Sequence, residues 1–155
     1  MSGGAVQVRR AELGDAEVMA RLLHDFTSEF GDPTPPLDVL AANLRDVLAG
    51  GHFWALLAGD PVQGILTVAE RPTAFSPGAA LYLEDLYVEP AHRGQGMGGA
   101  LMARLFEEAA ERQASLVEIG VDESDVDAMR FYERHGMIHR DPESGERAFY
   151  IYREF

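Results

Sequence analysis

Two groups of side chains in the middle of the chain have the types and spacing needed for chemistry. The first is a pair of neighbouring carboxylates, Glu84 and Asp85, within the otherwise apolar stretch 81–88. A carboxylate inside an apolar strand is costly unless it is paired or used, for instance to accept a proton. The second is a run of four glycines within positions 94–99. Glycine permits positive φ and lets the backbone come close to a ligand.

The elements around these residues indicate how they are positioned. Residues 81–88 are rich in leucine, tyrosine and valine, which predicts a strand, and Pro90 ends it by removing a backbone donor. After the glycines, apolar residues recur at helical spacing up to Gln113. The glycine-rich first turn of this helix would present unpaired N–H groups to a phosphate or diphosphate. Because neighbours on a strand point to opposite faces, we expect Glu84 and Asp85 not to share one site directly.

The glycines permit two interpretations. Residues 94–99 satisfy the G-x-G-x-x-G fingerprint of dinucleotide-binding proteins, and Glu118 or Asp122 could be its later acidic residue. That fingerprint opens directly after its strand, however, whereas residues 89–93 intervene here. The unit also lies outside any longer alternation of parallel strands and helices. We therefore favour the second interpretation, a loop for a different phosphate ligand.

The second interpretation rests on a resemblance to the GNAT N-acetyltransferases. Arg93-x-x-Gly96-x-Gly98 resembles the acetyl-CoA motif of that family, Gln/Arg-x-x-Gly-x-Gly/Ala, which stands at the same strand-to-helix junction. Within the family, the stretch from Tyr82 to Val88 together with this motif is most similar to the diamine- and spermidine-type acetyltransferases.

Both ends of the chain extend the resemblance over nearly its whole length. Val8-Arg9-Arg10-Ala11 with Asp15 is similar to the opening of many members. Residues 125–137 resemble the second signature of the family, Asn-x-x-Ala-x-x-Phe-Tyr-x-x-x-Gly-Phe. Two positions depart from that signature, with Asp125 in place of Asn and Met137 in place of Phe.

The resemblance implies acetyl-CoA as co-substrate. The loop amides would hold the diphosphate, the strand before the loop would splay from its neighbour to bond the pantetheine arm, and the Leu86 N–H would polarise the thioester carbonyl. Asp125 keeps an acceptor but loses the donor of Asn, so we expect weaker cofactor binding or a substitute group. The implied cofactor-binding residues are Leu86, Tyr87, Val88, Arg93, Gly94, Gln95, Gly96, Met97, Gly98, Gly99, Asp125 and Ala128.

The resemblance also implies two catalytic residues. Tyr132 is similar to the general acid of the family, since a phenol with a pKa of about 10 can donate to the departing thiolate. Without the signature around it, Tyr132 would read as an ordinary packed aromatic. Glu84 matches a glutamate that receives the proton of the amine, directly or through water; its alternative is a surface carboxylate. The candidate substrate-binding residues are Glu84, Asp85, Glu29 and Glu118, the last two with solvated carboxylates as the alternative.

The predicted order of elements along the chain is β-α-α-β-β-β-α-β-α-β-β. It corresponds to an α+β, GNAT-like acyl-CoA N-acyltransferase fold with a mixed twisted sheet of about seven strands and about four helices. Asp15 is expected to cap the first helix, which should end near Gly31. Strands are expected at 116–121 and in a terminal hairpin of residues 137–140 and 147–152, and the last helix at 128–135.

Composition limits the class of protein. The 155 residues predict one domain, 1–155, and the net charge of −13 disfavours nucleic acid as a partner. There is no cysteine, and the histidines share no ligand spacing, so no metal site is expected. No apolar run is long enough to span a bilayer, and the start lacks a signal-like segment, which favours a cytoplasmic protein without a membrane partner. The apolar end, 149–152, could pair across a homodimer, as in relatives.

We therefore expect an acetyl-CoA-dependent N-acetyltransferase that acts on a small cationic amine by direct transfer in a ternary complex. Two alternatives remain open at this point. One is acetylation of a protein or peptide amine, and the other is a non-catalytic acyl-CoA-binding sensor.

Overall fold

The computed structural model describes residues 4–155, which fall into two compact units, one up to Glu118 and one from Ile119 to Phe155. The second unit contains α4 (Val126–Arg134). Short 3-10 turns lie at Leu13–Asp15 and Pro90–His92. The first unit contains β1 (Val8–Arg10), α1 (Ala16–Phe30), α2 (Leu37–Ala49), β2 (Phe53–Ala58), β3 (Gly64–Arg71), β4 (Ala80–Val88), α3 (Met97–Glu111) and β5 (Leu116–Glu118).

The strands of the first unit form one mixed sheet. Within the described residues it has five strands in the order β1-β2-β3-β4-β5. Neighbours from β1 to β4 are antiparallel, whereas β5 runs parallel to β4 after a crossover through α3. A parallel pair needs such a crossover, so the predicted mixed sheet is confirmed, as is the order of the first nine elements.

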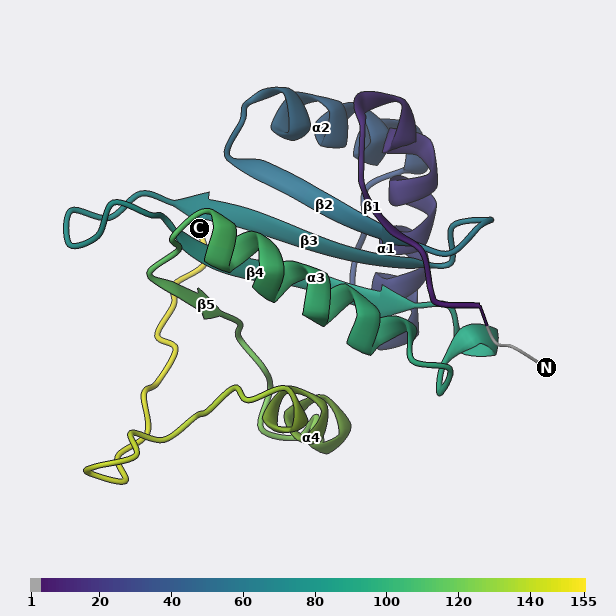
Figure 1. The fold of residues 1–155 in the computed structure, drawn as a ribbon. Helices are drawn as coiled ribbons and strands as arrows, with labels where there is room; N and C mark the ends of the chain where they lie inside the picture. The colour runs from purple at the N-terminus through teal and green to yellow at the C-terminus, as the bar shows by residue number, and fades with distance from the viewer. Residues whose placement is uncertain (1–3) are drawn as a thin grey trace. The chain divides into compact units, whose positions relative to one another are not determined.

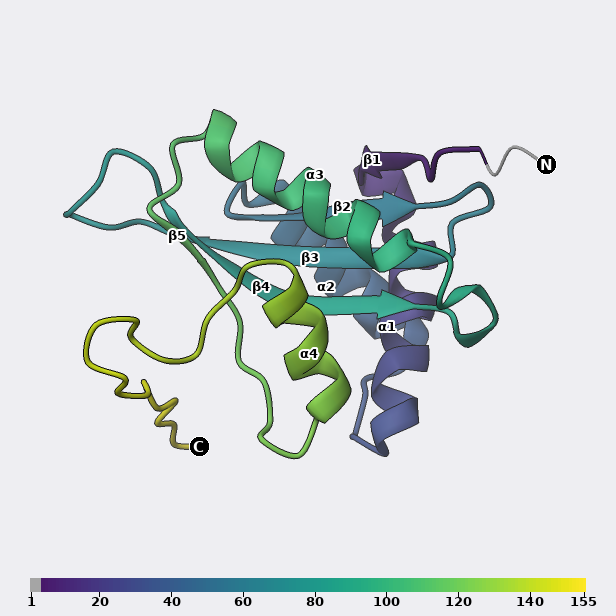
Figure 2. The same cartoon turned by 60° about the horizontal axis from the view of Figure 1, so that its bottom comes forward.

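The sheet of the first unit is covered on both faces. Figures 1 and 2 show α1 and α2 on one face and α3 on the other. Burial on both faces explains why the central strands β2 and β3 are almost continuously apolar. One core cluster joins α1 and α2 to the sheet, for example through Met19, Leu22, Leu57 and Ile65. Each fully buried side chain of this size contributes about 1.5–3 kcal/mol.

Helix α3 is seated closely on the sheet at its first turn. The glycine at 64 makes room for it, because a Cβ there would lie 2.9 Å from Met97 Sδ and 3.4 Å from Leu101 Cδ1. The α3 side chains of Leu101, Met102 and Leu105 are fully buried. The sheet therefore fixes where α3 begins, and with it the preceding glycine-rich loop.

A polar cluster holds the other end of α3. The guanidinium groups of Arg10 and Arg112 lie 4.2 and 4.7 Å from the centroid of the Trp54 ring. Trp54 Nε1 donates to Glu70 Oε1 at 2.8 Å, and Arg112 pairs with the same carboxylate. Arg10 also pairs with Glu108 of α3 at 3.3 Å. Cation–π contacts and shared carboxylates thus tie the helix to β1, β2 and β3.

The end of α4 in the second unit follows the sequence signal. Gly136 has a φ of +83°, and its N–H donates to Glu133 O at 3.0 Å, while the Met137 N–H donates to Tyr132 O at 3.0 Å. This pair of bonds is a Schellman motif, which needs glycine at that position. The start differs from the expected residue 128, because α4 begins at Val126.

The expected number of strands is wrong. Residues 137–140 and 147–152 retain only the bridge between Arg140 and Arg147, and β5 stops at Glu118. The turn between them does form, with the Asp141 N–H donating to Glu146 O at 2.8 Å. Beyond the turn, Ile138 and Ile151 are 73% and 90% exposed, so the hairpin buries too little apolar surface to hold a ladder. The described chain therefore has five strands, not about seven.

No helix within residues 4–155 is long and apolar enough to cross a bilayer.

Candidate active site

A β-bulge in β4 sets the geometry of the acidic pair. Thr67 of β3 is opposite Asp85 and Val68 is opposite Leu83, so Glu84 is an extra residue without a partner in this register. A bulge bends its strand and interrupts the regular alternation of side chains. This relaxes the alternation that we expected to keep the two carboxylates apart, and the charge of Asp85 acts on Glu84.

The two carboxylates have different surroundings. Glu84 is exposed and, within the part of the chain that the structure describes, makes no hydrogen bond or ion pair. Desolvation, and then the charge of Asp85, raises the pKa of Glu84 above its ordinary value. Asp85 is half-buried, and its Oδ2 accepts a hydrogen bond from Thr67 Oγ1 at 2.6 Å. Burial raises the pKa of Asp85, and the bond from Thr67 opposes that rise. The pair thus combines a free carboxylate with an anchored one.

The edge of β4 opens next to this pair. β5 pairs only with Ala80, Leu81 and Tyr82, so in the described part of the first unit the remainder of β4 has β3 as its sole strand neighbour. An open edge of this kind is what the sequence resemblance implies for the pantetheine arm. Leu86 and Val88 lie on this segment, so their backbone groups are the candidates for bonding it.

The loop after β4 fits a diphosphate. Gly94 and Gly96 have φ values of +74° and +84°, which other residues adopt only with strain. Ala100 is the first residue of α3 whose amide bonds back, to Gly96 O at 3.0 Å. Among the described residues, the amides of residues 94–99 have no backbone acceptor. Unpaired amides at a helix start are suited to binding an anion, so the loop is a candidate for the diphosphate site that the sequence predicts.

The side chain of Arg93 braces the loop. Its Nε donates to Val88 O at 2.8 Å, and its Nη2 donates to both oxygens of Glu29 at 2.8 and 3.0 Å. The guanidinium also lies 5.5 Å from the centroid of the Tyr87 ring. The side chain of Tyr87 is itself buried, so only its backbone is available to a cofactor. The Val88 carbonyl is likewise already bonded.

Two of the candidate substrate carboxylates have arginine partners. Glu29, at the end of α1, is held by Arg93. Glu118, at the end of β5, pairs with Arg71 at 2.8 Å. Their charges are therefore compensated locally, in contrast to the charge of Glu84.

The remaining candidates lie on α4 in the second unit. Tyr132 is half-buried, and its ring meets that of Phe131 edge to face at 5.2 Å between centroids. Asp125 precedes the helix, and its Oδ1 accepts from the Ala128 N–H at 3.1 Å. An N-cap needs only an acceptor, which Asp and Asn both supply, so this bond gives the substitution a structural reason.

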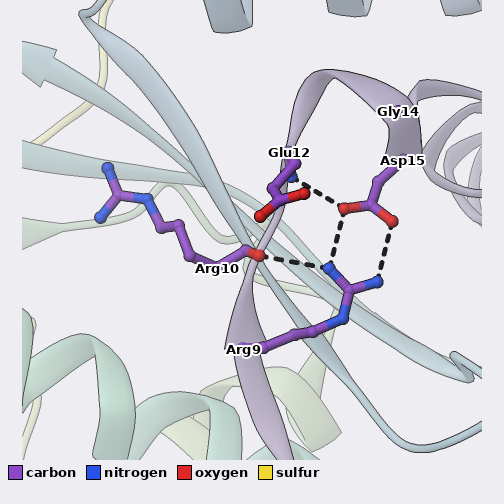
Figure 3. A pocket seen from close by; sticks show the side chains of 5 residues that line it. All are labelled: Arg9, Arg10, Glu12, Gly14 and Asp15. Carbon is purple, nitrogen blue, oxygen red and sulfur yellow. Dashed lines mark hydrogen bonds and ion pairs between the residues drawn. The ribbon is translucent and has the colours of Figure 1, made fainter.

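A shallow pocket lies away from the acidic pair, at the entry to α1 (Figure 3). Arg9 donates to both oxygens of Asp15 at 2.8 Å, and the Glu12 N–H donates to Asp15 Oδ2 at 2.8 Å. The bonds from Arg9 lower the pKa of Asp15. The residues that resemble the opening of many family members thus form a hydrogen-bonded cluster. We expected Asp15 to cap α1, but its carboxylate accepts from Arg9 and from the Glu12 N–H, and not from an amide of α1.

Sequence reasoning missed Thr67. A threonine within the apolar run of β3 carries no signal of its own, and only the register places it opposite Asp85. No group of three or more possible metal ligands occurs among residues 4–155.

Comparison with protein families and curated proteins gives related sequences over most of the chain. The model of the Acetyltransferase (GNAT) family matches residues 17–137. Thialysine N-epsilon-acetyltransferase of Bos taurus is 29% identical over 143 residues, which cover 84% of this chain and 83% of the relative. Spermidine/spermine N(1)-acetyltransferase-like protein 1 of Homo sapiens is 29% identical over 161 residues. That match covers 96% of this chain but only 23% of the human protein.

Solved structures share the fold along the full length. A protein of Arthrobacter sp. FB24, assigned as an acetyltransferase without a stated substrate, has a TM-score of 0.91 and 42% identity. That match covers 100% of this chain and 99% of the other. An aminoglycoside acetyltransferase from an uncultured soil sample has a TM-score of 0.80 at 20% identity, again over 100% and 99%, which shows the likeness of fold.

Proposed function

The chain belongs to the GNAT family of acetyl-CoA-dependent N-acetyltransferases, and from this premise we propose that it acetylates a primary amine of a small cationic molecule, such as a polyamine, a diamine or an amino-acid-like amine. Transfer is direct, within a ternary complex of enzyme, acetyl-CoA and amine. Residues 1–155 act as a single catalytic domain.

The observation that carries the proposal is the acidic pair at the bulge. Glu84 has no hydrogen-bond or ionic partner in the described chain, whereas Glu29 and Glu118 are paired with arginines. An unpaired carboxylate beside a second carboxylate attracts a cation. The pair also lies on β4, the strand that leads into the glycine-rich loop, and this supports an amine site close to the proposed thioester site.

The chemistry assigns one step to each group. An ammonium with an ordinary pKa of about 10.4 must lose its proton, and Glu84 accepts it directly or through a water molecule. The amine nitrogen then attacks the thioester carbonyl, whose oxygen accepts from the Leu86 N–H. As the C–N bond forms, the nitrogen gives its second proton to water, the C–S bond breaks, and Tyr132 donates its proton to the departing thiolate. Glu84 then releases its proton to the solvent, and Tyr132 regains one from it. The amides of residues 94–99 hold the diphosphate throughout.

A panel of amines tests the proposal. Purified enzyme with acetyl-CoA should acetylate diamines and polyamines, and a diamine should have a higher kcat/KM than the amino alcohol of the same length, because the second ammonium is missing from the latter. Mass spectrometry identifies the product and the nitrogen that carries the acetyl group. Transfer only to peptides would favour a protein acetyltransferase, and binding of acetyl-CoA without transfer to any amine would favour a sensor.

The proposal includes the assembly and the location of the enzyme. The contiguous apolar residues 149–152 are 70–90% exposed, which supports a homodimer that covers them. We also propose that the enzyme acts in the cytoplasm. Cell fractionation tests the location, and the mass in solution tests the dimer.

A further inference from the structure

Thr67 is the one fully buried polar residue in the described chain. It lies in β3 between Leu66 and Val68, which are also completely buried. Removing a hydroxyl from water costs free energy unless the hydroxyl finds a hydrogen-bond partner. An apolar residue would fill this position at lower cost, so the hydroxyl requires an explanation.

The partner of the hydroxyl is Asp85, directly opposite on β4. Thr67 Oγ1 donates to Asp85 Oδ2 at 2.6 Å, a length typical of a hydroxyl donating to a carboxylate. A β-branched side chain on a central strand has few rotamers, so the donor is held rigidly. The bond lies at the bulge, next to the unpartnered Glu84.

This bond distinguishes two carboxylates that would otherwise be similar. Neighbouring carboxylates resist being ionised together, and a donor aimed at one of them favours the charge on that one. Thr67 reaches only Asp85, while Glu84 has no donor within residues 4–155. The second oxygen of Asp85, Oδ1, has no partner among the described residues and is available to a ligand.

We propose that Thr67 is a positioning residue of the amine site: it holds Asp85 as the permanent anion that binds the cation of the acceptor and leaves Glu84 to exchange the proton. This inference rests on the proposed function, because it assigns cation binding and proton transfer to different carboxylates of the same site. The pKa shifts are consistent with this division: burial raises the pKa of Asp85 and the bond from Thr67 opposes that rise, whereas desolvation and then the charge of Asp85 raise the pKa of Glu84. No other charged group of the described chain contributes to either shift.

Two substitutions separate the hydroxyl from the shape of the side chain. Thr67→Val keeps the branched shape and removes the donor, whereas Thr67→Ser keeps the donor. We expect Thr67→Val to raise KM for a diamine by roughly tenfold or more, as loss of one bond to a charged group implies. Thr67→Ser should stay within about twofold, and the affinity for CoA should not change in either variant.

The pH dependence gives the sign of the effect. Removing a donor to the ionised form raises the pKa of Asp85, so in Thr67→Val the KM for the diamine should begin to rise at a higher pH as the solution is acidified. In an Asp85→Asn background, Thr67→Val should add nothing, because Thr67 acts through that carboxylate. An effect of Thr67→Val that persists in Asp85→Asn overturns the proposal, as does an equal loss in Thr67→Ser.

A titration followed by NMR separates this inference from the proposed function. The carboxyl carbon of Asp85 should titrate at a higher pH in Thr67→Val than in the wild type and in Thr67→Ser. An unchanged titration overturns the role of Thr67 even if the enzyme acetylates amines. Absence of transfer to every amine, with the expected titration, overturns the proposed substrate class and leaves the bond between Thr67 and Asp85 established.

Discussion

The surroundings of Glu84 are set by an irregularity in its strand. On a regular strand it would be paired with β3 and would alternate strictly with Asp85. The bulge removes its partner on β3, and desolvation, followed by the charge of the neighbouring Asp85, raises its pKa. The sequence presents the acidic pair plainly, whereas the bulge depends on the register between β3 and β4 and has no local signal.

Replacing Glu84 should lower kcat and abolish the acidic limb of the pH profile. A base must be ionised to act, so kcat/KM of the wild type should fall as the pH drops through the raised pKa of Glu84. Glu84→Gln should lower kcat by roughly 10²–10⁴-fold and abolish that limb. Asp85→Asn is the matched control: it removes the second cause of the raised pKa of Glu84 and leaves desolvation in place, so the same limb should move to lower pH without disappearing. An unchanged profile in Glu84→Gln would exclude Glu84 as the base.

Tyr132 should affect chemistry and not cofactor binding. Tyr132→Phe removes the proton donor and keeps the ring that meets Phe131. We expect kcat to fall by roughly 10²-fold or more, with the affinity for CoA within about twofold of the wild type. Steady-state kinetics and calorimetry measure the two quantities. An unaltered kcat would point to a different proton donor, or to no chemistry that needs one.

At the scale of elements, the position of the glycine-rich loop depends on how α3 packs on the sheet. The glycines at 94 and 96 turn the chain with positive φ, and the glycine at 64 lets the first turn of α3 sit close to the sheet. The amides of residues 94–99 are thereby placed at the end of β4. The position of the loop depends on packing below it as well as on its own sequence.

The loop prediction can be tested with a pair of glycines. Gly96 and Gly51 have φ values of +84° and +80°, and a Cβ at either meets nothing within 4 Å. Alanine at either position should therefore cost a similar strain, about 1–2 kcal/mol, measured by denaturant unfolding. Only Gly96→Ala should raise KM for acetyl-CoA, because only Gly96 belongs to the loop. Equal effects of the two variants on KM would indicate that the loop is not the diphosphate site.

The elements also show where sequence patterns succeed and fail. Helical spacing followed by a glycine predicted that α1 ends near Gly31 and that α4 ends at Gly136. Both helix ends depend only on residues close in the sequence. The motif around Arg93 predicted the loop, but not that the guanidinium would engage Glu29, 64 positions earlier. The prediction of a terminal hairpin was wrong, because an alternating pattern does not ensure that the apolar side chains are buried.

At the scale of the whole molecule, charge and exposed apolar surface act on different partners. The net charge of −13 favours the approach of a cationic amine and opposes nucleic acid. It also opposes association of like chains, so contact between two copies needs an apolar surface. Residues 149–152 supply one, with Tyr150 and Tyr152 stacked at 5.5 Å between ring centroids.

The mass in solution decides whether this apolar end joins two chains. Size-exclusion chromatography with light scattering should give twice the mass of one chain, and higher salt should strengthen the dimer by screening the repulsion between acidic subunits. Phe149→Ser with Ile151→Ser should shift the mass to that of the monomer, because both side chains are at least 75% exposed and would be covered in the dimer. Phe75→Ser is the control, since Phe75 is a lone aromatic, 98% exposed, in the loop before β4, and its loss should leave the mass unchanged. A monomeric wild type at every concentration and salt would remove the homodimer from the proposal.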